Sequence, residues 1–559
     1  MVRKAFLLIV CGALVVLFAL PGVAGATVFC VDTTPGVLVD NDSIDPSCEA
    51  PQGTLLSALL AAQGQPGADT VLIGPGSYTL AAAPNEAETH YASSDVLHLR
   101  GIGDPHLTMG GTQGMQTGLS IEAGDGSTVE GFSMTIPANV DVAGDWALAV
   151  GGVGISQVLV RDLHFDGPAA TNARAIVLDH GSTLVDSTVA LPKVANPTNL
   201  AVAASSGDVT LIHDNLTADV GLSTSGNTAT VERSTVTAWW GLQTDGGTLI
   251  VRNSLIEIEP RSNAIGIKLA NDNNSNYTIL GTFENDTIVG GEGFTSAGIR
   301  VQANQSQETA NATIADTVIA GPTNALQVWS DAEREAKATV LYSNYDPATV
   351  DIKTNLDGIG TSGTSTYLPT EVTNLAPGFV DPAGGDFHLA PGSALVDAGD
   401  PAAPPAGALD LDGDARALAG TCGSAARRDI GADELALSCP PASDGGGETQ
   451  GAPGGAPAGG PSQTTKHAAV PDTTIALRGK HLVKTTASSA KVTVTIGSTV
   501  AGSTYSCRVD KKPWRSCKAT TTLRLKPGKH KVAAVAATAA GTDPTPATVR
   551  VRVIGADGG

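Results

Sequence analysis

Short apolar segments separated by small polar turns dominate the first 350 residues. A pattern of apolar, any, Asn/Asp/Ser, small polar and apolar residues recurs, as in VRDLHF from Val160, VRNSLI from Val251 and IADTVI from Ile314. Its copies return at intervals of 19 to 32 residues. Such intervals are typical of solenoid repeats, in which each repeat has no core of its own and stacks on its neighbours.

The composition of these segments predicts their secondary structure. They are short, rich in Val, Ile and Thr, and lack long helical periods, which favours a right-handed parallel β-helix over helical or leucine-rich repeats. Asn and Asp at the third position of the pattern are expected to be turn residues in left-handed geometry. The third positions are Asp162, Asp186, Asp214, Arg233, Asn253, Asn285 and Asp316.

The N-terminal region predicts a targeting segment followed by a cap. Residues 1–26 combine a basic start, an apolar run and the small residues Ala24, Gly25 and Ala26, the features of an export signal cleaved near Ala26. No later stretch is expected to span a membrane, so the mature chain is predicted to be secreted or at the cell surface. Residues 55–62 are apolar at helical spacing after Thr54, which predicts a short cap helix before the first rung.

Composition also divides the chain. Residues 441–465 form a Gly/Pro/Ala/Ser linker, which separates a solenoid over 27–440 from a domain over 466–559. Five or more alternating strands in that last domain predict an antiparallel β-sandwich, so the whole chain is all-β. Residues 466–559 carry a net charge of +12 and residues 1–465 one of −34, which indicates different partners for the two parts.

Six cysteines remain after the signal segment. Their even number in an exported chain predicts disulfides, and proximity in the sequence favours three local pairs. Zinc is the alternative, which the absence of C-x-x-C spacing disfavours. The expected pairs are Cys30 with Cys48, Cys422 with Cys439, and Cys507 with Cys517.

Four Gly-apolar segments, GLST at Gly221, GLQT at Gly241, GIKL at Gly266 and GIRV at Gly298, followed by ALQV at Ala325, predict a column of stacked strands. If the apolar residue points inward, the next residue points outward. The outward ladder is then Ser223, Gln243, Lys268, Arg300 and Gln327, with Asp245 nearby. We expect either a groove for an anionic or neutral polysaccharide or a solvated polar face.

Two adjacent tryptophans, Trp239 and Trp240, lie beside this ladder. On a strand one would point inward and the other outward, where an indole can stack on a sugar ring. The alternative is that both lie in a loop folded over the solenoid.

Three segments carry a resemblance to known families. Residues 386–434, with DFHLAPGSALVDAGDP, ALDLDGDARALAG and RRDIGADE, resemble the choice-of-anchor Q end segment of secreted bacterial parallel β-helix proteins of pectin-lyase-like fold. The resemblance implies an end cap over 386–440. AGSTYSCRVDKKPWRSC and the strands after it resemble a bacterial immunoglobulin-like domain, which implies that Cys507 and Cys517 clamp a hairpin beside Trp514.

The D-x-D-G-D loop within the end segment has candidate metal ligands. Asp410, Asp412 and Asp414 alternate, as carboxylates do around Ca²⁺, but the bidentate Glu of an EF-hand loop is replaced by Thr421. The alternative is an acidic surface turn with Gly413 at positive φ.

These features predict a monomeric binding protein whose partner is a polysaccharide or an anionic cell-wall polymer. We expect no nucleic-acid partner, because the chain has an export signal, an acidic body and no recognisable nucleic-acid-binding motif. The alternative is a carbohydrate-active enzyme, a polysaccharide lyase or a glycoside hydrolase. We find neither the residue set of polygalacturonases nor an evident pair of catalytic carboxylates.

Overall fold

A computed structural model describes most of the chain, which divides into two compact units, Met1–Pro440 and Pro441–Gly559. Within the described residues, no helix is long and apolar enough to cross a membrane. The described residues are 26–31, 50–80, 89–109, 117–136, 146–152, 157–167, 173–194, 199–270, 278–304, 309–331, 334–355, 362–402, 408–420, 426–435, 473–478, 482–485, 488–498, 503–510, 512, 514–538, 541–542 and 547–554.

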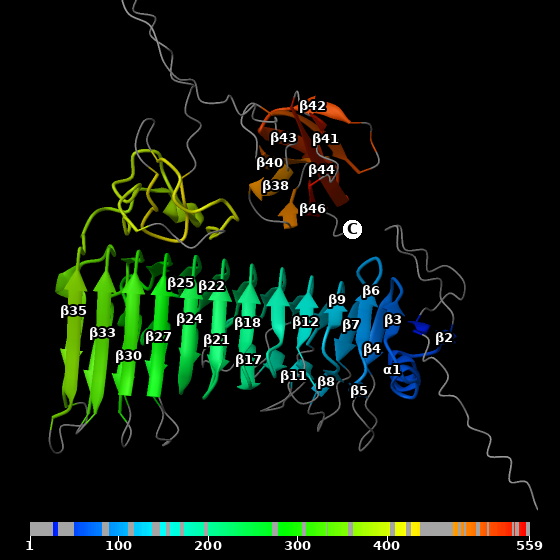
Figure 1. Cartoon of the computed structure of the whole chain (residues 1–559), viewed down its shortest axis with the longest axis horizontal. Coiled ribbons are helices and arrows are strands. Elements are labelled where there is room, and N and C mark those ends of the chain that lie inside the picture. Colours follow the sequence, from blue (N-terminus) through cyan, green and yellow to red (C-terminus); the bar gives the residue numbers. More distant parts are fainter. Residues whose placement is uncertain are drawn as a thin grey trace, which may run out of the picture. The chain divides into compact units, whose positions relative to one another are not determined.

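The first unit is a right-handed parallel β-helix, as the sequence predicts. Its central rungs each add one strand to sheets A, B and C in turn, and Figure 1 shows the strands stacked in sequence order. Every pairing between these rungs is parallel, because the chain returns to the same sheet after one full turn.

Sheet A has 14 described strands: Val28–Val31 (β1), Ala50–Gln52 (β2), Asp69–Ile73 (β3), Leu97–Gly101 (β6), Ser127–Glu130 (β9), Val158–Arg161 (β12), Thr183–Val185 (β15), Val209–Ile212 (β18), Thr228–Glu232 (β21), Gly247–Arg252 (β24), Thr278–Glu284 (β27), Thr309–Ala315 (β30), Glu335–Leu341 (β33) and Thr364–Thr370 (β35). Sheet B has ten: Ser77–Leu80 (β4), His106–Met109 (β7), Ser133–Thr135 (β10), His164–Asp166 (β13), Thr188–Ala190 (β16), Asn215–Thr217 (β19), Thr235–Ala238 (β22), Leu255–Ile258 (β25), Thr287–Gly290 (β28) and Val318–Ala320 (β31). Sheet C has 11: Thr89–Ala92 (β5), Thr117–Ala123 (β8), Trp146–Gly152 (β11), Arg174–Asp179 (β14), Leu200–Ser206 (β17), Val220–Thr224 (β20), Trp240–Thr244 (β23), Ala264–Ala270 (β26), Ser296–Ala303 (β29), Asn324–Ser330 (β32) and Val350–Lys353 (β34).

Aliphatic side chains fill the interior in columns that run from rung to rung. In sheet A, one column joins Leu99, Val129 and Val160 near its start to Phe283 and Ile314 near its end. All five are fully buried. Each rung therefore supplies one layer of a continuous core, which explains why an isolated rung would not be stable.

The predicted cap helix is present as α1 (Leu55–Gln63). Thr54 is its N-cap and forms a capping box with Ser57, which satisfies two backbone N–H groups of the first turn. Leu55, Ala58, Leu59 and Ala62 are buried, and the helix contacts β1, β3 and β5 at the first rungs.

The corner between sheets A and B turns through a residue in left-handed geometry on successive rungs. Asp186, Asn253 and Asn285 have φ values of 52°, 54° and 56°, as predicted. One position of the predicted column is wrong: His213, with φ 59°, occupies the turn, and Asp214 is 2% exposed. Ile212 aligns with Val185 in the sheet, so His213 aligns with Asp186.

A buried polar ladder follows directly after these turn residues. Its hydroxyl and carboxyl groups accept hydrogen bonds from backbone N–H groups one rung earlier: Ser187 N–H donates to Asp214, and Ser234 N–H donates to Ser254. Without these acceptors the corner would leave buried N–H groups unsatisfied. The ladder consists of Ser187, Asp214, Ser234, Ser254, Asp286, Thr317 and Ser343, each at most 2% exposed.

After β35, the chain forms a small antiparallel pair, Phe379–Asp381 (β36) and Asp386–Leu389 (β37), around the 3₁₀ turn Pro382–Gly384 (η2). An earlier 3₁₀ turn, Pro347–Thr349 (η1), precedes β34.

We call residues 386–402, 408–420 and 426–435 the clasp (yellow in Figure 1). The sequence predicts that this segment caps the end of the solenoid. Its described residues instead contact the A/B corner of rungs that precede the last one.

The second unit is a β-sandwich, as predicted. One sheet holds Thr473–Arg478 (β38), Ala490–Ser498 (β40) and Thr520–Leu525 (β43), and all its described pairings are antiparallel. The other holds Leu482–Lys484 (β39), Thr504–Val509 (β41), Arg515–Cys517 (β42), Gly528–Thr538 (β44), Gly541–Thr542 (β45) and Ala547–Ile554 (β46). Its pairing of β39 with β46 is parallel, which differs from the fully antiparallel sandwich that the sequence predicts. Val494 and Ile496 from the first sheet pack against Val532 and Ala534 from the second.

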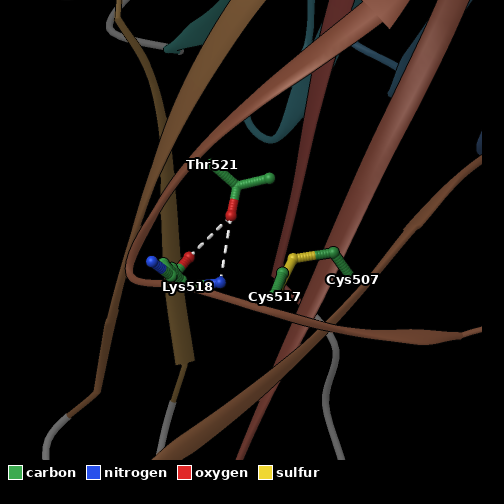
Figure 2. The surroundings of a disulfide bond; sticks show 4 residues. All are labelled: Cys507, Cys517, Lys518 and Thr521. Atoms are coloured by element: carbon green, nitrogen blue, oxygen red, sulfur yellow. Dashed lines mark hydrogen bonds between the residues drawn. A yellow bond between two sulfur atoms is a disulfide. The ribbon is translucent and has the colours of Figure 1, made fainter.

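The predicted disulfide between Cys507 and Cys517 is present and joins β41 to the edge strand β42 (Figure 2). In the turn after β42, Thr521 Oγ1 donates to the Lys518 carbonyl at 2.8 Å and accepts from its N–H at 3.1 Å. Cys30 is also disulfide-bonded. Its expected partner Cys48, and the expected pair Cys422 and Cys439, lie outside the described residues.

The buried ladder yields a pH-dependent prediction. Burial raises the pKa of Asp286 well above its usual range, so the folded protein binds this proton more tightly than the unfolded chain does. The stability that this provides is complete at acidic pH and is lost as the pH rises through the folded pKa. Asp286→Ser introduces the neutral hydroxyl that the ladder has at Ser234 and Ser254. We expect calorimetry to show a higher Tm than wild type at about pH 8 and a smaller fall in Tm between about pH 5 and pH 8.

Ser254→Ala is the matched control at the neighbouring rung. It leaves the Ser234 N–H without an acceptor and should cost about 1–3 kcal/mol at both pH values. A Tm of Asp286→Ser below that of wild type at about pH 8 would contradict this account of the ladder.

Candidate functional site

The predicted outward ladder on sheet C has the register that the sequence analysis proposed. Ser223 pairs with Gln243, Gln243 with Lys268, Lys268 with Arg300, and Arg300 with Gln327. The two basic residues therefore lie side by side on neighbouring strands, which is unfavourable in isolation.

Burial differs along this ladder. Lys268 is only 6% exposed and Gln327 only 7%, whereas Gln243 and Arg300 are half-buried. The ladder is therefore not the uniformly open polar face that either interpretation of the sequence assumed. Asp245, the remaining candidate, follows β23 directly and is also half-buried, with its N–H donating to the Thr224 carbonyl.

Both predicted tryptophans are half-buried and fixed by hydrogen bonds. Trp239 Nε1 donates to the Ser262 carbonyl and Trp240 Nε1 to the Asn263 carbonyl, each at 3.1 Å. Trp239 packs against the hydrophobic core, and Trp240 begins β23, pairs with Val220 and contacts Lys268 of the outward ladder.

Cations lie over the indole rings of all five tryptophans of the chain. Within sheet C, Arg174 lies 5.3 Å from the Trp146 ring centroid and Lys268 lies 5.1 Å from that of Trp240. Arg261 and Arg508 lie similarly over Trp239 and Trp514. Such contacts fix the position of the cation and shield part of the ring, so these tryptophans are less available for stacking than the sequence suggested.

Trp329 carries two cations and was not among the predicted site residues. The Arg300 guanidinium lies 4.5 Å and the Lys353 ammonium 4.0 Å from its ring centroid. Because β32 lies between β29 and β34, the two cations reach the ring from neighbouring rungs on opposite sides. We call Arg300, Trp329 and Lys353 the cation stack.

The cation stack is held by further polar contacts. Arg300 Nε donates to Gln327 Oε1 at 2.7 Å, and Trp329 Nε1 donates to Asp351 Oδ2 at 3.1 Å. Lys353 also pairs with Asp351 at 3.0 Å. Trp329 lies two residues after Gln327, so continuing the outward alternation by one step would have identified it.

A second group of charged residues fastens the clasp. Arg416 and Glu434, whose side chains are each 1% exposed, form an ion pair at 3.5 Å. Arg416 also donates to the carbonyl groups of residues 431–433. Glu434 accepts from the N–H groups of Leu418 and Asp429. Arg416, Asp429 and Glu434 of this motif therefore bind one another's segments and hold the clasp together.

The clasp binds the solenoid through the left-handed turn residues of three successive rungs. Arg416 Nε donates to Asn253 Oδ1, Asn285 Nδ2 donates to the Asp429 carbonyl, and the Asp400 N–H donates to Asp316 Oδ1. Arg428 adds ion pairs to Glu284 and Asp316. The turn residues Asn253, Asn285 and Asp316 therefore also form the edge on which the clasp docks, which we call the docking edge.

The three predicted metal ligands do not converge. Asp410 is fully buried and accepts from the N–H groups of Asp412, Asp414 and Glu434. Gly413 has φ 90°, as the alternative interpretation expected. The carboxylate of Asp412 contacts His388 Nε2 at 2.8 Å instead.

Several clasp acids are shifted toward their neutral forms. Burial raises the pKa of Asp410 and of Asp429 to about 7, and that of Asp316 at the docking edge to about 6. The hydrogen bond to Asp412 raises the pKa of His388 to about 10. These values reflect a buried, strongly acidic interior of the clasp.

A cavity of about 380 Å³ lies beside the last strand of sheet B, β31. Its lining combines small residues with Ile319, Tyr345 and Leu375, and its carboxylate, Asp346, caps η1. Nothing in this lining indicates a catalytic group.

Comparison with known proteins adds little to this description. No protein-family model matches the chain, and no curated protein does. Among solved structures, the crystal structure of pectate lyase Pel9A is similar at 14% identity and a TM-score of 0.42, over 74% of this chain and 98% of that chain. The assignment of the fold follows from the three parallel sheets themselves.

Removing Arg416 tests the role of the clasp motif. Arg416→Met leaves Glu434 buried without its cation, which costs about 3–5 kcal/mol in comparable buried pairs. We expect a lower Tm for the first unit and faster proteolysis within 386–435. Arg161→Met is the control: Arg161 pairs with Glu130 at the surface and is 51% exposed, so its loss should cost about 0–1 kcal/mol. Equal effects of the two substitutions would rule out a fastening role for Arg416.

Proposed function

We propose that the protein is exported and binds a polysaccharide or cell-wall material along sheet C of its β-helix. The features of residues 1–26 support export, although residues 1–25 lie outside those described. Sheet C supports a linear ligand because its outer columns repeat at ~4.8 Å from rung to rung. A chain molecule can therefore contact several rungs with one repeated chemistry.

The side chains on this face have the chemistry that sugars and uronates require. Gln243 supplies an amide, while Arg300 and Lys353 supply cationic donors that pair with carboxylate or sulfate groups. Trp240 and Trp329 hold such cations in place, so little side-chain freedom is lost when a ligand binds.

The cation stack is the observation that carries the proposal. Its indole has a cation near each face, so we assign sugar recognition to the charges that it presents and not to stacking on the Trp329 ring. Arg300 on β29 and Lys353 on β34 lie one rung to either side of Trp329, so an anionic group of the ligand can bind close to both charges. This favours an acidic polysaccharide over a neutral one.

The second unit supports attachment to an anionic cell envelope. Its basic side chains are largely exposed and clustered in sequence, and Trp514 is 37% exposed beside Arg508. Association of this kind is long-range and weakens with salt. The exposed members are Arg508, Lys512, Arg515, Lys518, Arg524, Lys526, Lys529 and Lys531.

Binding of the full chain to polygalacturonate, measured by calorimetry, tests the proposal. We expect Arg300→Gln with Lys353→Gln to weaken binding by at least about tenfold, because two charge-assisted contacts are lost. Arg161→Gln with Arg252→Gln, both on sheet A, is the charge-matched control and should bind like wild type. A neutral polysaccharide such as mannan should bind more weakly and lose little affinity in the double variant.

Two outcomes would overturn the proposal. Binding to both polymers that is unchanged in the double variant would place any glycan site elsewhere. Release of unsaturated or reducing ends during the same incubation would assign the chain to the enzyme class instead.

A further inference from the structure

A histidine and two aspartates of the clasp meet at one point. His388 lies on β37, Asp412 lies in the loop after Asp410, and Asp433 lies near the end of the described clasp. One ligand atom from each lies within 4.8 Å of the other two. The three residues are thus brought together by the folding of the clasp, from positions up to 45 residues apart.

The imidazole is held at both ring nitrogens. Asp386 Oδ1 lies 2.5 Å from His388 Nδ1, on the same strand, and Asp412 Oδ2 lies 2.8 Å from Nε2, so Nε2 releases its proton when it binds a metal ion. A carboxylate on the far ring nitrogen is the usual orienting partner of a metal-bound histidine. Asp433 Oδ2 accepts the Leu389 N–H, so its carboxylate is also held in a fixed position.

A small cavity adjoins two of these residues. It has a volume of about 40 Å³ and is lined by His388 and Asp433 together with Phe387, Leu411 and Leu255 of the solenoid. This is room for about one water molecule, which would complete a coordination shell of three protein ligands. Access from solvent is open, because the side chains of His388 and Asp412 are 42% and 50% exposed.

Carboxylates and an arginine surround this point. Asp386, Asp412 and Asp433 lie around the imidazole, and Arg233 Nη1 lies beside Gly413 of the neighbouring loop. A divalent cation bound here would displace the His388 Nε2 proton and take its place as the partner of Asp412.

We propose that His388, Asp412 and Asp433 bind one divalent transition-metal ion, with Asp386 as the positioning residue for His388. The mixed nitrogen and oxygen ligands suit Zn²⁺, whereas Ca²⁺ requires six to eight oxygen ligands. The ion would tie β37 to the loop at Asp412 and to the end of the clasp, and so fasten the clasp to itself. This site differs from the Ca²⁺ loop that the sequence suggested and shares only Asp412 with it.

Calorimetric titration of the untagged, metal-stripped full chain with ZnCl₂ tests the proposal. We expect one Zn²⁺ per chain and a higher Tm that EDTA reverses. His388→Gln, Asp412→Asn and Asp433→Asn should each weaken binding at least tenfold. Asp386→Asn should keep the stoichiometry and weaken binding by about 10–100-fold, as loss of an orienting partner does.

Asp414→Asn is the matched control, since Asp414 belongs to the same loop but not to the ligand group. It should bind Zn²⁺ like wild type. No Zn²⁺ binding by folded wild-type protein, or binding unchanged by all three ligand substitutions, would overturn the proposal. Binding of Ca²⁺ in place of Zn²⁺, with loss in Asp414→Asn, would also overturn it and would restore the loop of Asp410, Asp412 and Asp414. None of these outcomes depends on polysaccharide binding.

Discussion

The corner between sheets A and B is the constraint on which the first unit depends. In every rung the chain has to bend from sheet A into sheet B without leaving buried N–H groups unsatisfied. A left-handed residue makes the turn, and a buried hydroxyl or carboxyl after it accepts the N–H of the previous rung. Three of these turn residues, Asn253, Asn285 and Asp316, also bind the clasp. The repeated left-handed turn therefore contributes both to the folding of the solenoid and to the docking of the clasp.

The sequence predicted those features that depend on local pattern. Strand class, the cap helix after Thr54, the outward register from Gln243 to Arg300 and the disulfide between Cys507 and Cys517 all follow from alternation, capping and spacing. The repeat was misaligned at Asp214 because its rung begins the motif one residue earlier, and only strand pairing shows this.

Features that depend on contacts between distant segments could not be predicted in the same way. The position of the clasp results from bonds across more than 100 residues, such as that between Arg416 and Asn253. The pairing of Asp412 with His388, 24 residues apart, depends on how the clasp folds, so the regular D-x-D-G-D spacing predicts the wrong partners for Asp412. The burial of Lys268 likewise results from packing around the sheet, which the alternation of residues does not predict.

The candidate binding face on sheet C depends both on local sequence pattern and on packing between rungs. Alternation places basic residues on the outside of sheet C, and packing places a tryptophan beside each of Arg174, Lys268 and Arg300. Hydrogen–deuterium exchange with and without polygalacturonate tests this assignment most directly. The account predicts added protection in β29, β32 and β34, with sheet A unchanged. Protection confined to sheet A, the clasp or the second unit would contradict it.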